Sequence, residues 1–219
     1  RFAKEFFNDP EGSGKWSVPK DALRSAMEVG GHTPSYAKPT LFRIRDDLFM
    51  LMADHEYGVS GIKRADVTKA TLAARKEIHA SVNALRKSGG VWKNVRIVAT
   101  PEQIGIREAR RLHGRYKLTL EDILAGRKFD DAVCRVTFAI DVHSTNPNKT
   151  KGIAQAPGRV KPYDIPLRAL IAKDLDGLYF AGRCISGDFF AHASYRVTGN
   201  AVATGEGAGK AAAAFAAAR

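Results

Sequence analysis

Apolar and small residues recur at helical spacing between Asp66 and about Lys87. At steps of three and four along this segment stand Val67, Thr71, Ala74, Ile78, Val82 and Leu85. Because this spacing puts them on one face, it predicts a long amphipathic helix. We expect Asp66 or Thr68 to cap its start and Gly89-Gly90 to end it. A shorter helix is predicted from Pro19 to Met27, within a loop-rich beginning.

Other segments have the patterns of β-strands and of two further helices. Two apolar runs, 41–44 and 48–51, flank the polar pair Asp46-Asp47, which predicts a β-hairpin. Strands are also expected over 95–100, 133–142 and 178–181, the last of them buried. A short helix capped by Thr119 is predicted from Leu118 to Gly126, and an alanine-rich helix from Val202 to Ala218. Residues 144–163 contain three prolines and two glycines without an apolar period, and predict a long exposed loop.

Composition and charge narrow the class of protein. The chain has 219 residues, 44% of them hydrophobic, which suits one large or two small domains. No run approaches the roughly 20 apolar residues of a membrane span, so we expect a soluble protein. The 35 Lys and Arg against 23 Asp and Glu give a formal net charge of +12, which favours anionic ligands or partners. Cys134 and Cys184 form no CxxC motif, and we expect no metal site.

The most informative segment is 178–205, where a predicted strand stops at Gly182 and a helix starts near Asn200. A glycine at the end of a strand allows close approach of a ligand or of another backbone. The start of a helix offers unpaired N–H groups and the positive end of its dipole. Such groups suit an electron-rich oxygen. Reduction of a flavin builds negative charge around N1 and O2 of its ring, which a helix start there would stabilise.

This segment resembles the C-terminal part of FAD-dependent oxidoreductases, in the two-domain flavoprotein group related to fumarate reductase and succinate dehydrogenase flavoproteins. Segments 103–111, 138–143 and 163–168 are similar to one subgroup of that family. The resemblance implies an α/β fold, with an α+β cap region and then the closing strand and helix of a Rossmann-like FAD-binding domain. It implies a substrate or cap domain over residues 1–132 and the C-terminal part of the FAD-binding domain over residues 133–219.

The resemblance also implies where FAD is bound. Gly182, Arg183 and the turn Cys184-Ile185-Ser186 would close the last strand of the FAD domain against the dinucleotide. The tripeptide Gly199-Asn200-Ala201 would lie at the pyrimidine edge of the flavin. Gly182 and Gly199 have an alternative interpretation as simple turn residues.

Catalytic roles follow from the same resemblance, for hydride transfer between a substrate and flavin N5. Arg107 and Glu108 would face the site, and Arg196 would help to hold an anionic or polyhydroxylated substrate. His143 is the candidate base because an imidazole titrates near a pKa of about 6.5, and His192 is a second candidate. In the structural alternatives, His143 only caps the end of a strand and Arg107-Glu108 is an ordinary ion pair.

One departure from the family pattern is large. The sequence contains no GxGxxG turn, which binds the FAD pyrophosphate in a Rossmann unit. Gly205-Glu206-Gly207-Ala208-Gly209 is no substitute, because it lies within a predicted helix. We therefore expect the N-terminal Rossmann unit to come from a segment upstream of Arg1 or from a partner chain. Two other functions remain as alternatives: a basic nucleic-acid-binding module, and a non-catalytic interaction subunit that docks on a partner chain.

Overall fold

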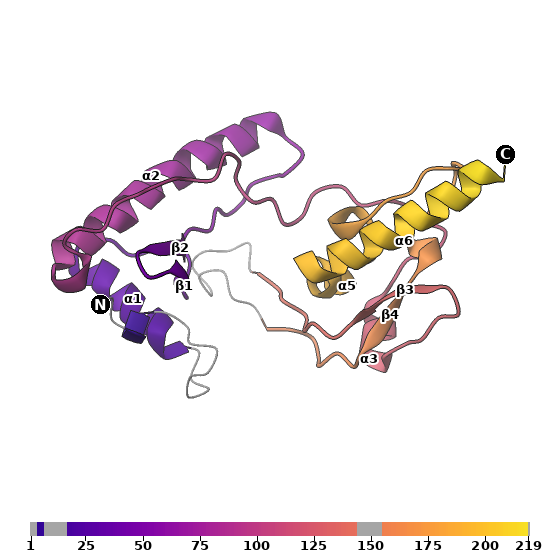
Figure 1. Cartoon of the computed structure of the whole chain (residues 1–219), viewed down its shortest axis with the longest axis horizontal. Helices are drawn as coiled ribbons and strands as arrows, with labels where there is room; N and C mark the ends of the chain where they lie inside the picture. The colour runs from indigo at the N-terminus through magenta and orange to yellow at the C-terminus, as the bar shows by residue number, and fades with distance from the viewer. Residues whose placement is uncertain (1–3, 7–16, 144–154, 219) are drawn as a thin grey trace. The chain divides into compact units, whose positions relative to one another are not determined.

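The structure is a computed structural model that describes residues 4–6, 17–143 and 155–218. The chain divides into two compact units, one of residues 1–105 and 143–153 and the other of residues 106–142 and 154–219. The position between residues 132 and 133, at which the sequence predicts a domain boundary, lies in strand β3 (Ala132–Val136) of the second unit. Helices and two small antiparallel sheets make up the described parts, which confirms the mixed α/β class (Figure 1).

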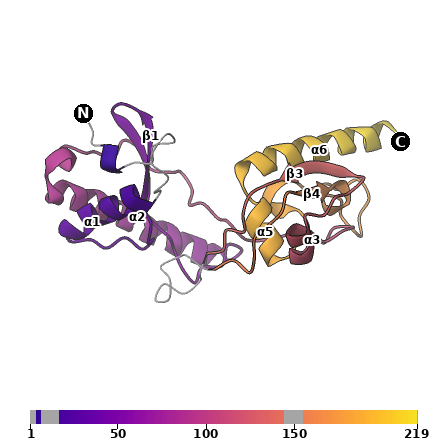
Figure 2. The same cartoon turned by 90° about the horizontal axis from the view of Figure 1, so that it is seen from below.

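The first unit packs helices beside a β-hairpin (Figure 2). Its elements are η1 (Lys4–Phe6), α1 (Ser17–Val29), β1 (Thr40–Arg45), β2 (Leu48–Met52), α2 (Arg64–Ser88) and η2 (Gly90–Trp92). The two strands pair antiparallel, with Leu41 opposite Leu51, and confirm the predicted hairpin. Six residues form the buried core of this unit: Leu23, Met27, Leu41, Ala53, Leu85 and Trp92.

Helix α2 confirms the longest predicted helix but starts differently. Its N-cap is Lys63, so neither Asp66 nor Thr68 caps it. The Asp66 carboxylate instead accepts a hydrogen bond from the Ser60 backbone N–H at 3.1 Å, in the preceding turn. A Cβ at Gly30, directly after α1, would lie only 1.9 Å from the Ala84 carbonyl oxygen. The close approach of α1 to α2 therefore requires glycine at this position.

The second unit surrounds a larger core. Its elements are α3 (Leu120–Ala125), β3, β4 (Tyr163–Pro166), η3 (Leu167–Ala169), η4 (Gly182–Cys184), α5 (Phe189–Tyr195) and α6 (Thr198–Ala217). Thr119 caps α3 in a capping box, as predicted. Helix α6 lies against β3, and a Cβ at Gly207 would be 2.8 Å from the Val133 Cβ (Figure 1). The glycines of the 205–209 stretch therefore lie within a helix, as expected.

Three strand predictions are wrong in whole or in part. Residues 95–100 join no ladder with any described segment, and Val98 is 80% exposed. The segment 178–181 contributes a single bridge, between Tyr179 and Ile171, and Leu178 is exposed. The strand expected over 133–142 ends at Val136. Residues 95–100 and those after Val136 have the apolar pattern but no partner strand among the described residues. Residues 178–180 do exchange backbone hydrogen bonds with 170–172, at 3.0 Å from Ala172 N to the Leu178 carbonyl and at 2.8 Å from Phe180 N to the Leu170 carbonyl, but the pairing is too short to form a strand.

Two further expectations concern the long loop and the absence of a membrane-spanning segment. Residues 144–154 of the predicted loop lie outside the described residues, and its last residue, Tyr163, is fully buried in β4. Among the described helices, none has both the length and the apolar character that crossing a membrane requires.

Candidate functional site

A glycine turn meets the start of a long helix in the second unit. Gly182 begins η4 with a φ of +61°, and its N–H donates a hydrogen bond to Thr204 Oγ1 at 3.0 Å. A Cβ at position 182 would lie 3.3 Å from the Ala201 Cβ. Thr204 is fully buried, and its hydroxyl donates in turn to the Asn200 carbonyl at 2.8 Å. The turn and the first two turns of α6 are thereby held against each other.

The start of α6 has hydrogen-bond donors without acceptors in the described part of the chain. The first N–H of the helix that has a backbone acceptor is that of Ala201, which donates to the Val197 carbonyl at 3.1 Å. The N–H groups of Thr198, Gly199 and Asn200 come before it and have no acceptor within the helix. The buried Asn200 Nδ2 also makes no hydrogen bond there. An electron-rich oxygen at this place would satisfy several donors at once.

Space and charge at the same helix start are compatible with an acceptor. A Cβ placed at Gly199 would meet nothing within 4 Å. The first turn of α6 contains no acidic residue, and no side chain caps it. The positive end of the helix dipole is therefore not neutralised by the helix's own residues.

The turn after Gly182 divides into exposed and buried residues. Arg183 and Cys184 are exposed, whereas Ile185 and Ser186 lie in the core. The Ile185 carbonyl accepts from the Tyr195 hydroxyl at 3.0 Å, which fixes the turn to α5. The side chains of Ile185 and Ser186 therefore pack in the core, and only their backbone atoms contribute to the turn.

Two arginines share one carboxylate near the end of α5. The Arg196 side chain is only 9% exposed, and its Nη2 donates to the Asp141 carbonyl. Asp141 Oδ2 lies 3.8 Å from Arg196 Nη2 and 3.5 Å from Arg107 Nη1. Burial, followed by the charge of Arg107, lowers the pKa of Arg196, and Asp141 opposes this shift. The carboxylate therefore allows two cations to lie close together.

Arg107 and Glu108 do not pair with each other. Arg107 lies beside Asp141, and the Glu108 carboxylate accepts from Arg111 at 3.1 Å. The interpretation of these neighbours as one ion pair is therefore wrong. Sequence reasoning singled out Arg107 and Arg196 but missed Asp141, although it stands within the segment 138–143 that carries the family resemblance.

His192 lies fully buried in α5, beside this group of arginines. Burial first, and then Arg111 and Arg196, lower the pKa of His192 to about 4. Its ring is 5.4 Å from that of Tyr195, in an edge-on arrangement. At neutral pH the imidazole is consequently uncharged, which is compatible with the positive residues around it.

His143 belongs to the first unit, unlike the other predicted site residues. Its ring lies 5.1 Å from that of His55 and 6.0 Å from that of Tyr36. His143 does not follow a strand, since β3 ends at Val136, so it does not cap a strand end.

The first unit also brings three carboxylates together, which the sequence did not indicate. Oxygen atoms of Asp54, Glu56 and Glu77 lie within 4.8 Å of one another. Ser35 donates to two of them, through its N–H to Glu77 at 2.7 Å and through its hydroxyl to Asp54 at 3.3 Å. Burial, then Glu77 and Glu56, raise the pKa of Asp54 to about 6. No spacing signal reveals this group, because Glu77 is on α2 and the other two are in a loop.

Comparison with known proteins gives one match. The model of a family described as FAD dependent oxidoreductase matches residues 14–219, nearly the whole chain. No curated protein and no solved structure matches the chain. The match includes segments from both compact units.

Proposed function

Because this chain belongs to the family of FAD dependent oxidoreductases, we propose that the start of α6 holds the pyrimidine edge of the flavin. Membership of the family makes the protein an oxidoreductase and a flavoprotein with FAD as its cofactor. The observation that carries the proposed site is the set of donors around Asn200, whose buried Nδ2 has no acceptor among the described residues. The open space at Gly199 leaves room for a ring edge beside them.

The residues at this place fit a flavin edge chemically. Three helical N–H groups and one amide donor suit a pair of acceptors such as O2 and N1. The dipole of α6 would stabilise the negative charge that these atoms gain on reduction. Gly182 fits the same interpretation, since a Cβ there would lie 3.3 Å from the Ala201 Cβ and narrow the space at the helix start. We extend the proposal to the exposed Arg183 and Cys184, as residues of the turn that faces the dinucleotide.

When bound, FAD supplies the hydride acceptor, and the reaction we propose is hydride transfer between flavin N5 and a small anionic or polyhydroxylated substrate. Arg196 and Arg107 would bind the negative charge of that substrate. Asp141 would position both guanidinium groups, as its contacts of 3.8 and 3.5 Å suggest. Glu108 would act only through Arg111. His143 is proposed as the base, since the uncharged His192 with its pKa of about 4 is a poor proton acceptor near neutral pH.

The relation to a wider flavoprotein group and the domain organisation are also proposals. We propose a relation to the fumarate reductase and succinate dehydrogenase flavoproteins, in which the C-terminal part of this chain closes a Rossmann-like domain. Residues 1–132 would then contribute the substrate or cap domain and residues 133–219 the FAD domain. Since this sequence lacks a GxGxxG turn, the ADP end of FAD would be held by residues outside it, in an upstream segment or a partner chain.

The test uses the purified natural assembly and its flavin absorbance. Asn200→Asp replaces the unmatched donor with a carboxylate, so we expect a lower flavin content and a more negative reduction potential for any flavin retained. Asn94→Asp makes the same chemical change at a residue of the first unit and should leave both quantities unchanged. An Asn200→Asp assembly with normal flavin content and potential would refute the site. A colourless wild-type assembly that takes up no FAD would refute the function.

A further inference from the structure

A cavity of about 440 Å³ in the second unit is lined mainly by cationic and small residues. Its polar lining consists of Arg111, His113, Lys117, Lys173 and Ser186, and none of its lining residues is a carboxylate. We call this the basic cleft. Its volume is within the range of about 300 to 1,000 Å³ that is typical of small-molecule sites. None of the residues proposed to contact the flavin edge or the substrate lines it.

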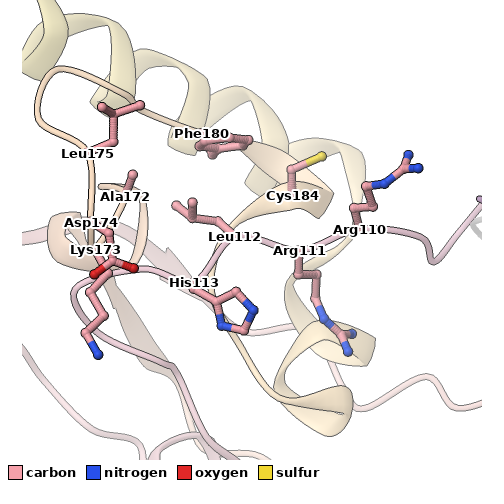
Figure 3. Close-up of a pocket in the computed structure, with 10 residues that line it drawn as sticks. All are labelled: Arg110, Arg111, Leu112, His113, Ala172, Lys173, Asp174, Leu175, Phe180 and Cys184. Carbon is pink, nitrogen blue, oxygen red and sulfur yellow. The ribbon is translucent and has the colours of Figure 1, made fainter.

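Arg111 and His113 of the basic cleft belong to a non-helical segment that ends at a bend over residues 115 and 116. This backbone is hydrogen-bonded on both sides: Leu112 N donates to the Cys184 carbonyl at 2.8 Å, and the His113 carbonyl accepts from Lys173 N at 2.9 Å. Side chains of an extended segment alternate between two faces. Figure 3 draws the neighbouring cavity, and in it Leu112 points towards Phe180 and Ala172, whereas Arg111, His113 and Lys173 are directed to the opposite side. Lys117 comes after a bend at residues 115 and 116 and also lines the basic cleft.

Most of this positive charge has no carboxylate partner. Arg111 pairs with Glu108 at 3.1 Å, and Arg115, which does not line the cleft, pairs with Asp176 at 2.7 Å. In residues 17–143 and 155–218, neither Lys117 nor Lys173 forms an ion pair, and His113 forms none either. Asp174 directly follows Lys173 in the sequence. It lines the neighbouring cavity and does not line the basic cleft. Lys117 and Lys173 are both exposed, and among the described residues no carboxylate neutralises either ammonium group.

We propose that the basic cleft binds the phosphate group of a small-molecule ligand. A phosphate carries about 1.5 to 2 negative charges near neutral pH, which matches two unpaired lysines. Lysine binds phosphate as a point charge, and Arg111 offers the planar donors that add geometric specificity. The backbone bonds to Cys184 and Lys173 fix the main chain beside the cleft, whereas the exposed lysine side chains become ordered when a ligand binds. The test does not depend on the proposed flavin site, because the two lysines that it changes belong to the cleft alone.

The probe is inorganic pyrophosphate, titrated by calorimetry into the purified natural assembly. We expect Lys117→Ala combined with Lys173→Ala to weaken pyrophosphate binding by about tenfold or more, since each lysine contributes a charge-assisted contact. The matched control combines Lys76→Ala with Lys93→Ala, two exposed lysines of the first unit, and removes the same charge. The control should bind like the wild type. Equal weakening in both double variants, or no pyrophosphate binding by the wild type, would overturn the proposal.

A second titration identifies the source of the phosphate. If the cleft variant loses FAD and pyrophosphate in parallel, the group bound is the diphosphate of FAD, and the proposal that only residues outside this sequence hold the ADP end is wrong. If it keeps FAD and loses pyrophosphate, the ligand is a separate phosphorylated compound. Either result supports the cleft. Binding of duplex DNA without binding of pyrophosphate overturns it in favour of a surface for nucleic-acid polymers, which steep salt dependence would accompany.

Discussion

The backbone N–H of Gly182 donates to the Thr204 hydroxyl at 3.0 Å, joining the turn of η4 to the second turn of α6. Thr204→Val keeps the shape of the side chain but leaves this N–H without its acceptor. We expect a loss of about 1 to 3 kcal/mol in the free energy of unfolding, measured by urea denaturation. Thr204→Ser retains the hydroxyl and should lose less. A valine variant as stable as the wild type would show that the contact contributes nothing.

Two glycines of α6 should respond oppositely to the same substitution. A Cβ at Gly207 would lie 2.8 Å from the Val133 Cβ, whereas one at Gly209 would meet nothing within 4 Å. Alanine is better than glycine within a helix by about 1 kcal/mol. Gly209→Ala should therefore raise the melting temperature, and Gly207→Ala should lower it because α6 must move away from β3. Equal effects of both substitutions would contradict the packing of α6 on β3.

Whether an element could be predicted depends on whether it needs only residues close in sequence or also a contact with a distant segment. The hairpin around Asp46-Asp47 and the capping box of Thr119 depend on residues close in sequence, and both were predicted. A strand needs a neighbour from elsewhere in the chain, so an apolar run such as 95–100 cannot reveal that its partner is missing.

The same limit applies to the candidate site. The convergence of Gly182 with Ala201 could be expected from the predicted turn at Gly182 and the predicted helix start near Asn200, although the strand expected before the turn forms only one bridge. The placement of Asp141 between two arginines could not, since the residues come from separate loops. Nor could the contact of Ser35 with both Asp54 and Glu77, which depends on how α2 packs within the first unit.

Asp54 should make the protein less stable as the pH rises. Its pKa is raised from 3.8 to about 6 in the folded state, so the folded chain binds this proton more tightly than the unfolded chain does. Stability is therefore lost between about pH 4 and pH 6 as the pH increases. Asp54→Asn removes the charge and can still accept from the Ser35 hydroxyl. We expect it to raise the melting temperature above about pH 6 and to have little effect below about pH 4.

The control for Asp54 is Asp174→Asn, at an exposed carboxylate of the second unit. This variant should show no such pH-dependent gain. If Asp54→Asn shifts the melting temperature equally at both pH values, the raised pKa of Asp54 is not the cause of the shift.

His143 is testable through the rate of flavin reduction. A general base typically contributes about 10² to 10⁴ in rate, so His143→Ala should slow reduction by that factor with a substrate that bleaches the wild-type flavin. His79→Ala, at an exposed histidine of α2, is the matched control. Stopped-flow absorbance under anaerobic conditions measures the step directly. Reduction at the wild-type rate would remove His143 from the mechanism.

His192 should have the opposite effect to Asp54 on the pH dependence of stability. Its pKa falls from 6.5 to about 4 on folding, so between these values the unfolded chain binds a proton that the folded chain does not. Stability is therefore lost as the pH falls from about 6.5 to about 4. Histidine NMR should show one imidazole that stays uncharged near pH 5, and its signal should be missing from His192→Asn. Removing a nearby cation with Arg111→Ala should raise that pKa, because Arg111 is the largest of the charges that lower it. An imidazole that titrates near 6.5 in the folded protein, unaffected by Arg111→Ala, would mean that His192 is neither buried nor surrounded by cations in solution.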